Sequence, residues 1–200
     1  MVTEIRIGGQ LKGYMALLEY EKPITPIDQE ILKFVSAVIA LEFAKSDAIS
    51  KARGHLGHEL LGDLVKGNIS SEASALNRVK SLDWCLGKFF QVVLIAGREN
   101  RSIGVEYFDS VQSIILRCIP ASKIGFSSKY IVVLASSNSK DVLKKALPDL
   151  ERFCQQYYLR IGIGRPYKTL MEISISFNEA QKALLLADSI EKPGHVHYYD

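Results

Sequence analysis

The chain has 200 residues, of which 48% are hydrophobic. This is enough apolar material for one large or two small domains. Its net charge is only +3 and its basic residues are spread along the chain, which excludes a dense basic block typical of nucleic-acid binding. Three widely separated cysteines, Cys85, Cys118 and Cys154, are typical of reduced thiols rather than of a disulfide framework.

No segment predicts insertion into a membrane or secretion. The longest apolar run, FVSAVIALEFA, is interrupted by Glu42 and is too short to cross a bilayer. The N-terminal MVTEIRIGG has neither the basic start nor the apolar centre of a signal peptide. We therefore expect a soluble, cytoplasmic protein with no membrane partner.

The N-terminal segment predicts a β-hairpin followed by a helix. TEIRIGGQLKGYMALLEY alternates at Ile5 and Ile7, passes a Gly-rich turn and continues as a strand over Tyr14–Tyr20. Thr25 suits the N-cap of the helix that follows, and Pro26 suits its first turn. The hairpin and the helix together occupy residues 1–47.

The predicted helix over residues 26–46 carries two apolar stripes. One stripe has the alternating spacing of four and three that is typical of a coiled-coil seam, and it consists of Ile27, Ile31, Phe34, Val38 and Leu41. The other consists of Leu32, Val35, Ile39 and Phe43. Two stripes indicate that one face covers the hairpin while the other meets a second copy of the chain. We therefore expect a homodimer through the 26–46 helix.

Residues 48–85 predict a helical connector with a weak centre. Its leucines are amphipathic, but Gly54, Gly57 and Gly62 each weaken a helix by up to ~1 kcal/mol. Gly67 is a predicted stop, and one of the two serines that follow at 70 and 71 can cap a further helix.

From residue 86 to 200 strands and helices alternate. FFQVVLIAG is a strand of the fully buried type, SKIGFSSKYIVVLASS is a hairpin that turns at Phe126–Ser128, and YLRIGIG and HVHYYD are two further strands. Helices are predicted near 107–118, over Lys140–Tyr157 with a kink at Pro148, and after a capping box of Ser176 and Glu179. The order β-α-β-β-α-β is the split βαβ pattern. It predicts an α+β, ferredoxin-like domain whose antiparallel sheet carries its helices on one face.

Gly162-Ile163-Gly164 is a fragment of a dinucleotide-binding fingerprint. The full G-x-G-x-x-G pattern needs a third glycine, but Tyr167 stands there. Pro166 also removes a backbone N–H from any phosphate-binding nest. We interpret the glycine pair as the end of a strand.

No other pattern indicates an assembled active site. His55 and His58 can share a helix face, but Gly62 replaces the second histidine of a His-Glu-x-x-His zinc motif. His195 and His197 alternate on the last strand without acidic partners. Cys118 and Cys154 lie on apolar stripes, and the carboxylates that fall at solvent-face spacing are Glu106, Asp109, Asp141 and Asp149. We therefore predict no catalytic, cofactor-binding or metal-binding residue.

The region of residues 56–200 resembles a known family. IGIGRPYKTLMEISISFNEAQKALLLAD and HVHYYD resemble a strand, helix and closing strand of the GGDEF-type nucleotide cyclase domain, in the degenerate version found in PucR/CdaR-like bacterial transcription regulators. ELLGDLVKGNI and VKSLDWCLGKFFQVVLIAG resemble the segments that precede them. Residues 2–47 resemble the last two strands and final helix of a GAF sensor domain.

The resemblance implies that the carboxylates of a working cyclase are missing. In the family, the hairpin sequence Gly-Gly-Asp-Glu-Phe and an aspartate after the first strand bind metal. Here Ser128 and Lys129 stand at the hairpin positions, and the strand ends in Ile95-Ala96-Gly97. Two-metal phosphoryl chemistry needs carboxylates, so we expect a protein that is not an enzyme and uses no cofactor.

The resemblance also implies a function. We expect a non-catalytic signalling and dimerisation module that relays sensor state to a helix-turn-helix domain, which the family places after the closing strand and outside this chain. DNA would be contacted only through that domain, and the chain would be a fragment of the regulator. The alternatives are a nucleotide-binding sensor that keeps a pocket at the hairpin, and a residual cyclase. No residue identifies the effector molecule.

Overall fold

The computed structural model of the chain describes all residues except 21–22, 98–102, 104, 128, 189–195 and 200. The chain divides into two compact units, Met1–His55 and Leu56–Asp200. No helix in the described part of the chain has the length and apolar character needed to cross a membrane.

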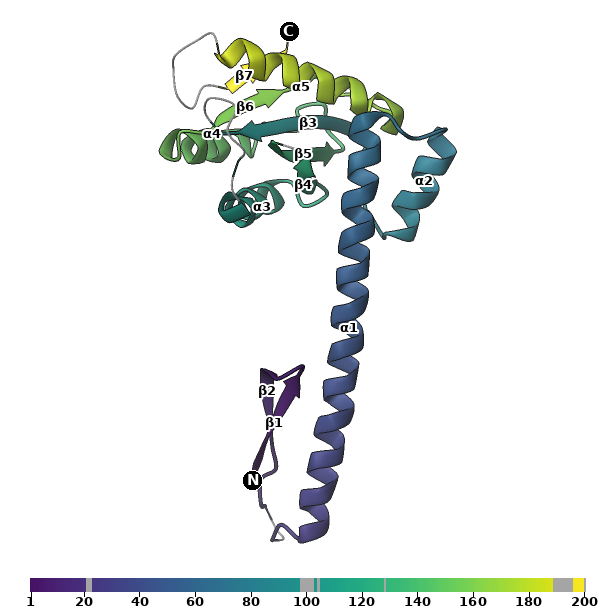
Figure 1. Cartoon of the computed structure of the whole chain (residues 1–200), viewed down its shortest axis with the longest axis vertical. Coiled ribbons are helices and arrows are strands. Elements are labelled where there is room, and N and C mark those ends of the chain that lie inside the picture. The colour runs from purple at the N-terminus through teal and green to yellow at the C-terminus, as the bar shows by residue number, and fades with distance from the viewer. Residues whose placement is uncertain (21–22, 98–102, 104, 128, 189–195, 200) are drawn as a thin grey trace. The chain divides into compact units, whose positions relative to one another are not determined.

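The N-terminal unit consists of a hairpin and the first part of a long helix (Figure 1). β1 (Val2–Ile7) and β2 (Gln10–Ala16) pair antiparallel, which confirms the predicted hairpin, although β2 ends earlier than expected. Thr25 caps α1 (Pro26–Lys66) as predicted: its Oγ1 accepts from the N–H of Asp28 at 3.3 Å, and its own N–H donates to the Asp28 carboxylate at 2.8 Å.

Helix α1 runs without interruption from Pro26 to Lys66, so the predicted weak centre does not break it. A Cβ added to Gly57 would lie 3.3 Å from the Trp84 ring. The absence of a side chain at Gly57 therefore leaves room for the indole to pack against the helix. Gly67 ends α1 in the left-handed conformation, with φ of 71°, which confirms the predicted stop. Ser71 then caps α2 (Glu72–Ser81).

The C-terminal unit contains a five-stranded sheet in the order β4-β5-β3-β6-β7. Its strands are β3 (Phe89–Ala96), β4 (Lys123–Ser127), β5 (Tyr130–Ser137), β6 (Arg160–Ile163) and β7 (Val196–Tyr198). All neighbours pair antiparallel except β7, which is parallel to β6. The sheet order confirms the predicted α+β, ferredoxin-like fold.

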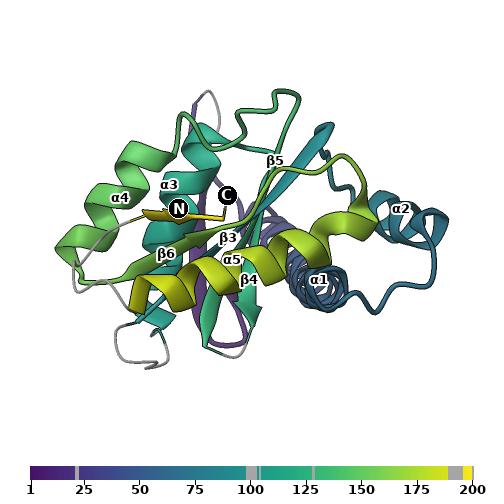
Figure 2. The same ribbon diagram turned by 90° about the horizontal axis from the view of Figure 1, so that it is seen from above.

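Helices cover both faces of this sheet (Figure 2), whereas the sequence predicted helices on one face. α3 (Phe108–Cys118), preceded by η2 (Val105–Tyr107), and α4 (Leu147–Gln156) pack on the face of Val93 and Ile95. The end of α1, α2 and α5 (Ile173–Asp188), which follows η3 (Leu170–Glu172), pack on the face of Val92 and Leu94. The one-face prediction was wrong because an unbroken apolar strand such as β3 needs both of its faces covered.

The residues that cover the second face include part of the predicted connector. Leu60, Leu64 and Val79 are buried in the same core as β3. The boundaries 1–47, 48–85 and 86–200 remain predictions, but residues 56–85 belong to the compact unit of the sheet.

Two predicted helix starts differ from the observed ones. α4 begins at Leu147 with Pro148 in its first turn, where a missing N–H is tolerated, so Pro148 starts a helix instead of kinking one. The capping box before α5 is formed by Thr169 and Glu172, not by Ser176 and Glu179. The latter two lie inside α5 and are buried.

Candidate functional site

The hairpin end of the sheet is where the resemblance places cyclase chemistry. Ala96, the last residue of β3, lies between the first residue of β5 and Arg160 of β6. Lys129 is exposed in the turn of the hairpin, and Ser128 lies outside the described residues. Arg160 donates to the carbonyl oxygen of Gly97 from Nε at 3.1 Å and from a terminal nitrogen at 2.6 Å. Two cationic side chains thus lie at the end where the family has carboxylates.

Aromatic side chains pack beside this hairpin. Phe126 of β4 stacks on Phe108 with 4.9 Å between ring centroids, and Phe108 also contacts the ring of His58 at 6.4 Å. His55 is exposed, and His195 lies outside the described residues. Within the described part of the chain, His, Cys, Asp and Glu side chains form no group of three that could hold a metal ion.

Among the other residues considered as candidates, one carboxylate is paired and the three cysteines differ in burial. Asp149 pairs with Arg117 at 2.7 Å. Cys154 is fully buried, and its burial raises the pKa of the thiol to about 12, so it stays protonated and unreactive. Cys118 is partly buried and Cys85 is exposed.

The glycine pair lies beneath α5. A Cβ added to Gly162 would lie 2.2 Å from the carbonyl oxygen of Ala180, and one added to Gly164 would lie 2.0 Å from that of Ser176. Only glycine therefore allows the helix to lie so close to the strand. β6 ends at Ile163, which confirms that the pair marks the end of a strand.

Glu179 holds the loop that follows this strand. Its carboxylate accepts from the Arg165 backbone N–H and Nε, both at 2.9 Å, and from the Tyr167 hydroxyl at 2.7 Å. Burial disfavours the charge of Glu179, but the hydrogen bonds from Arg165 and Tyr167 outweigh it and hold the pKa of Glu179 below its ordinary value. Arg165, Tyr167 and Glu179 therefore form one charged cluster that fixes the loop on α5.

The same loop is attached to β3. Gly164 donates to the carbonyl oxygen of Val92 at 3.0 Å, and Tyr167 exchanges two backbone hydrogen bonds of 2.8 Å with Phe90. Ser176 completes the contact, because its hydroxyl accepts from the Val92 N–H at 3.0 Å and donates to the Arg165 carbonyl oxygen at 2.8 Å. The loop is thus held firmly between strand and helix.

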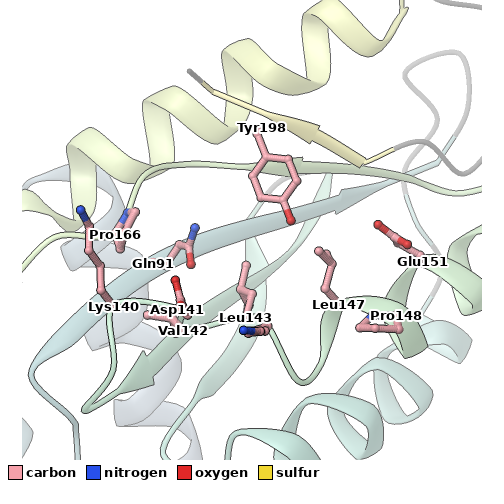
Figure 3. Close-up of a pocket in the computed structure, with 11 residues that line it drawn as sticks. Gln91, Lys140, Asp141, Val142, Leu143, Leu147, Pro148, Glu151, Pro166 and Tyr198 are labelled. Atoms are coloured by element: carbon pink, nitrogen blue, oxygen red, sulfur yellow. The ribbon is translucent and has the colours of Figure 1, made fainter.

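A pocket of about 480 Å³ lies beside this loop (Figure 3). It opens at the start of β3, away from the hairpin, and we call it the sheet-end pocket. Its polar lining consists of Gln91, Lys140, Asp141, Lys144, Glu151 and Tyr198, and its apolar lining of Val142, Leu143, Leu147, Pro148 and Pro166.

Gln91 and Tyr198 are the central polar groups of the pocket. Gln91 is only 7% exposed, and its Nε2 donates to the Gly164 carbonyl oxygen at 2.9 Å. The Tyr198 hydroxyl points into the pocket (Figure 3), where burial and the negative charge of Glu151 raise its pKa. The sequence analysis missed this site, although the polar residue within the apolar strand FFQVVLIA was an available signal.

Comparisons with known proteins agree with the fold. The family model described as GGDEF-like domain matches residues 66–186. The proline-responsive transcriptional activator PutR of Bacillus subtilis (strain 168) is 18% identical over 208 aligned residues, which cover 99% of this chain and 51% of PutR. The chain therefore spans about half the length of this relative.

Proposed function

The chain belongs to the GGDEF-like domain family, and from this premise we propose that it is a non-catalytic regulatory module of a PucR/CdaR-like bacterial transcription regulator. Its similarity to PutR, a transcriptional activator, supports the regulatory part of the proposal. The observation that carries the non-catalytic part is the charge at the hairpin end of the sheet, where Lys129 and Arg160 lie.

The charge at this end opposes cyclase chemistry. Phosphoryl transfer between nucleotides relies on divalent cations that carboxylates hold and neutralise. An exposed lysine in the hairpin and a guanidinium at the end of β3 repel such cations instead. The scaffold of strands and helices is retained, so the domain remains a folded unit on which other parts of a regulator can pack.

We propose that the module relays the state of a sensor to a DNA-binding domain outside this chain. One observation supports a relay: α1 contributes Leu32 to the N-terminal unit and Leu60 to the core of the C-terminal unit. A single helix shared by two units can transmit a shift or rotation between them.

The relay would act within a homodimer formed through the 26–46 helix. Every residue of the predicted coiled-coil stripe is exposed: Ile27 72%, Ile31 54%, Phe34 70%, Val38 50% and Leu41 70%. On the other stripe Leu32 is buried within its own unit, whereas Val35 (38%) and Phe43 (51%) are exposed. An exposed apolar stripe with coiled-coil spacing is suited to the same stripe of a second copy.

Incubation of the chain with GTP and magnesium or manganese tests the proposal directly. We expect no cyclic dinucleotide at enzyme concentrations at which an active cyclase, run in parallel, converts its substrate. Formation of the product would contradict the non-catalytic proposal and support the cyclase alternative. Calorimetry with GTP then addresses the nucleotide-sensor alternative, because binding without turnover would favour it.

A gel-shift experiment tests where DNA is contacted. We expect no sequence-specific shift with the 200 residues alone, because the net charge is small and the basic residues are dispersed. A tight and sequence-specific shift would place DNA binding within this chain. It would contradict the proposal that DNA is contacted by a domain outside the chain.

A further inference from the structure

The exposed apolar stripe of α1 continues beyond the 26–46 segment. After Leu41 the same helix face carries Lys45, Ile49 and Ala52, which are all exposed and all belong to the compact unit Met1–His55. We propose that a second copy of the chain covers the whole stripe from Ile27 to Ala52, and that Lys45 is the residue that limits this assembly to two chains. The inference rests on the proposed homodimer and deepens it, because it names the extent of the interface and the residue that determines its specificity.

Helix geometry places these positions on one face of α1. The stripe consists of residues 27, 31, 34, 38, 41, 45, 49 and 52, which are four or three positions apart. Its average spacing is about 3.6 residues, which equals the repeat of an α-helix. A strict heptad repeat would place Ala48 after Lys45 and would turn the stripe around the helix. Ile49, which is 47% exposed, keeps the stripe on one face and adds a large apolar side chain to it.

The hairpin packs on the opposite face of this helix. Leu32 and Ser36 are buried, and Lys12 of β2 forms an ion pair with Asp47 at 3.6 Å. At 3.6 residues per turn, positions 32, 36 and 47 lie on the side of α1 that faces away from the stripe. The hairpin of the same chain therefore does not cover the stripe.

The length of the extended stripe matches the needs of a stable helix pair. Ile27–Leu41 covers only about two heptads, whereas a coiled coil is typically sustained over at least about three to four. Continuation to Ala52 gives more than three heptads of contact. A second copy is the occupant that fits, because the same stripe on both chains forms a self-complementary, two-fold symmetric contact.

Lys45 interrupts the apolar residues of the stripe. Its Nζ lies 3.5 Å from the carboxylate of Glu42, and its side chain is 64% exposed. The methylene stem can therefore cover the stripe while the ammonium group stays in water beside Glu42. A single lysine at a core position of a coiled coil lowers stability and selects the number of chains. The edge of a helix pair lies close to water, whereas the centre of a larger bundle would bury the ammonium group.

Sedimentation equilibrium of the full chain over a concentration series tests the role of Lys45. Lys45→Leu is expected to tighten the dimer at least tenfold or to produce species larger than a dimer, because leucine completes the apolar stripe. Lys51→Leu, at an exposed position of α1 outside the stripe, is the matched control and should leave the affinity unchanged. A Lys45→Leu variant that forms neither a tighter dimer nor a larger species would overturn the role of Lys45.

Ile49 tests how far the interface extends. Ile49→Asp is expected to weaken the dimer at least tenfold, because it places a charge within an apolar contact. Leu76→Asp, on α2 and with a similar exposed fraction of 44%, is the control and should dimerise like the wild type. Circular dichroism verifies that each variant keeps its helices. If Ile49→Asp dimerises as tightly as the wild type, the interface ends before residue 49 and the extended stripe is wrong.

The failure of this inference and the failure of the proposed function are distinguishable. A wild-type dimer whose affinity changes with neither substitution would overturn the extended interface alone and leave the homodimer through residues 26–46 standing. A monomeric wild type would contradict that homodimer and this inference together. Formation of cyclic dinucleotide would overturn the non-catalytic proposal whatever the oligomeric state.

Discussion

Glu179 illustrates how a single buried carboxylate can organise a loop. It accepts hydrogen bonds from Arg165 and from the Tyr167 hydroxyl, and only 4% of the residue is exposed. Without it, the Tyr167 hydroxyl and the Arg165 backbone N–H would lose their acceptor. The cost of its removal is therefore set by unsatisfied donors as well as by charge.

Replacement of Glu179 by alanine is expected to lower the free energy of unfolding by about 1–3 kcal/mol. Urea denaturation followed by circular dichroism measures the change. Glu59→Ala, at an exposed position of α1, is the control and is expected to change stability by less than about 0.5 kcal/mol. Equal effects of the two substitutions would show that the hydrogen bonds of Glu179 do not stabilise the fold.

The contribution of Glu179 is also expected to depend on pH. Its pKa is lowered in the folded protein, chiefly because the bonds from Arg165 and Tyr167 outweigh burial. The stabilisation is therefore complete above the pKa of an unfolded glutamate and is lost as the pH falls through the lower folded value. The stability difference between the wild type and Glu179→Gln should shrink below about pH 5. A difference that stays constant down to pH 3 would contradict this linkage.

The three cysteines are expected to react at very different rates. Burial raises the pKa of the Cys154 thiol to about 12, whereas Cys85 is exposed. At pH 8 a thiol reagent should label Cys85 first and Cys154 only in denaturant, because the thiolate is the reactive form. Mass spectrometry of the labelled protein assigns the sites, and Cys85→Ser should remove the fast phase. Rapid labelling of Cys154 in the folded protein would contradict its burial.

At the scale of elements, the contact between α5 and β6 depends on two glycines. The carbonyl oxygens of Ala180 and Ser176 lie where the Cβ atoms of larger residues at 162 and 164 would be. The same close approach brings Ser176 into hydrogen-bonding range of β3. The loop that carries the pocket residue Pro166 is therefore held by a helix that packs closely on the strand.

Gly164→Ala is expected to destabilise the protein by about 3 kcal/mol or more, because its Cβ would lie 2.0 Å from the Ser176 carbonyl oxygen. Gly62→Ala is the matched control: it lies in α1 of the same unit, and an added Cβ meets nothing within 4 Å. Alanine there should stabilise by about 0.5–1 kcal/mol. Denaturant midpoints measure both, and a tolerated Gly164→Ala would contradict the observed packing.

At the scale of the whole molecule, the exposed stripe of α1 determines the expected assembly. Phe34 and Leu41 are both 70% exposed, although each is a large apolar residue. Such a stripe is unfavourable in water unless another surface covers it.

A double substitution of Phe34→Asp and Leu41→Asp is expected to convert a dimer into a monomer. Light scattering at micromolar concentration measures the mass of each species. Leu18→Asp, an 83% exposed apolar position outside the stripe, is the control and should remain dimeric. A wild-type protein that is already monomeric would contradict the proposed interface.

Much of the fold follows from local patterns. The strand over FFQVVLIA, the cap at Thr25 and the stop at Gly67 were predicted from neighbouring residues, and the structure confirms each. The start of α5 was not predicted correctly, because two Ser/Thr-x-x-Glu patterns lie close together along the chain. Thr169 and Glu172 form the cap, while Ser176 and Glu179 turn toward β3 and the loop.

The sheet-end pocket lay beyond sequence reasoning for a related reason. Gln91, Glu151 and Tyr198 are far apart along the chain and meet only when β7 joins β6 and α4 packs beside them. In the sequence, each of these residues is explained by its place in a strand, in a helix or near the end of the chain, so none of them indicates a pocket. The polar Gln91 in an apolar strand was the one local indication.

The sequence by itself determined the order of the strands and helices and the ferredoxin-like arrangement. It also showed that the hairpin has a lysine at position 129. These features depend on periodicity, capping and turn residues, which act over a few neighbouring positions. Only the tertiary structure decided that helices cover both faces of the sheet, that Glu179 binds a loop rather than a helix end, and that Gln91 and Tyr198 share a pocket. The physical reason is that burial and hydrogen bonding between distant segments arise only when the chain packs.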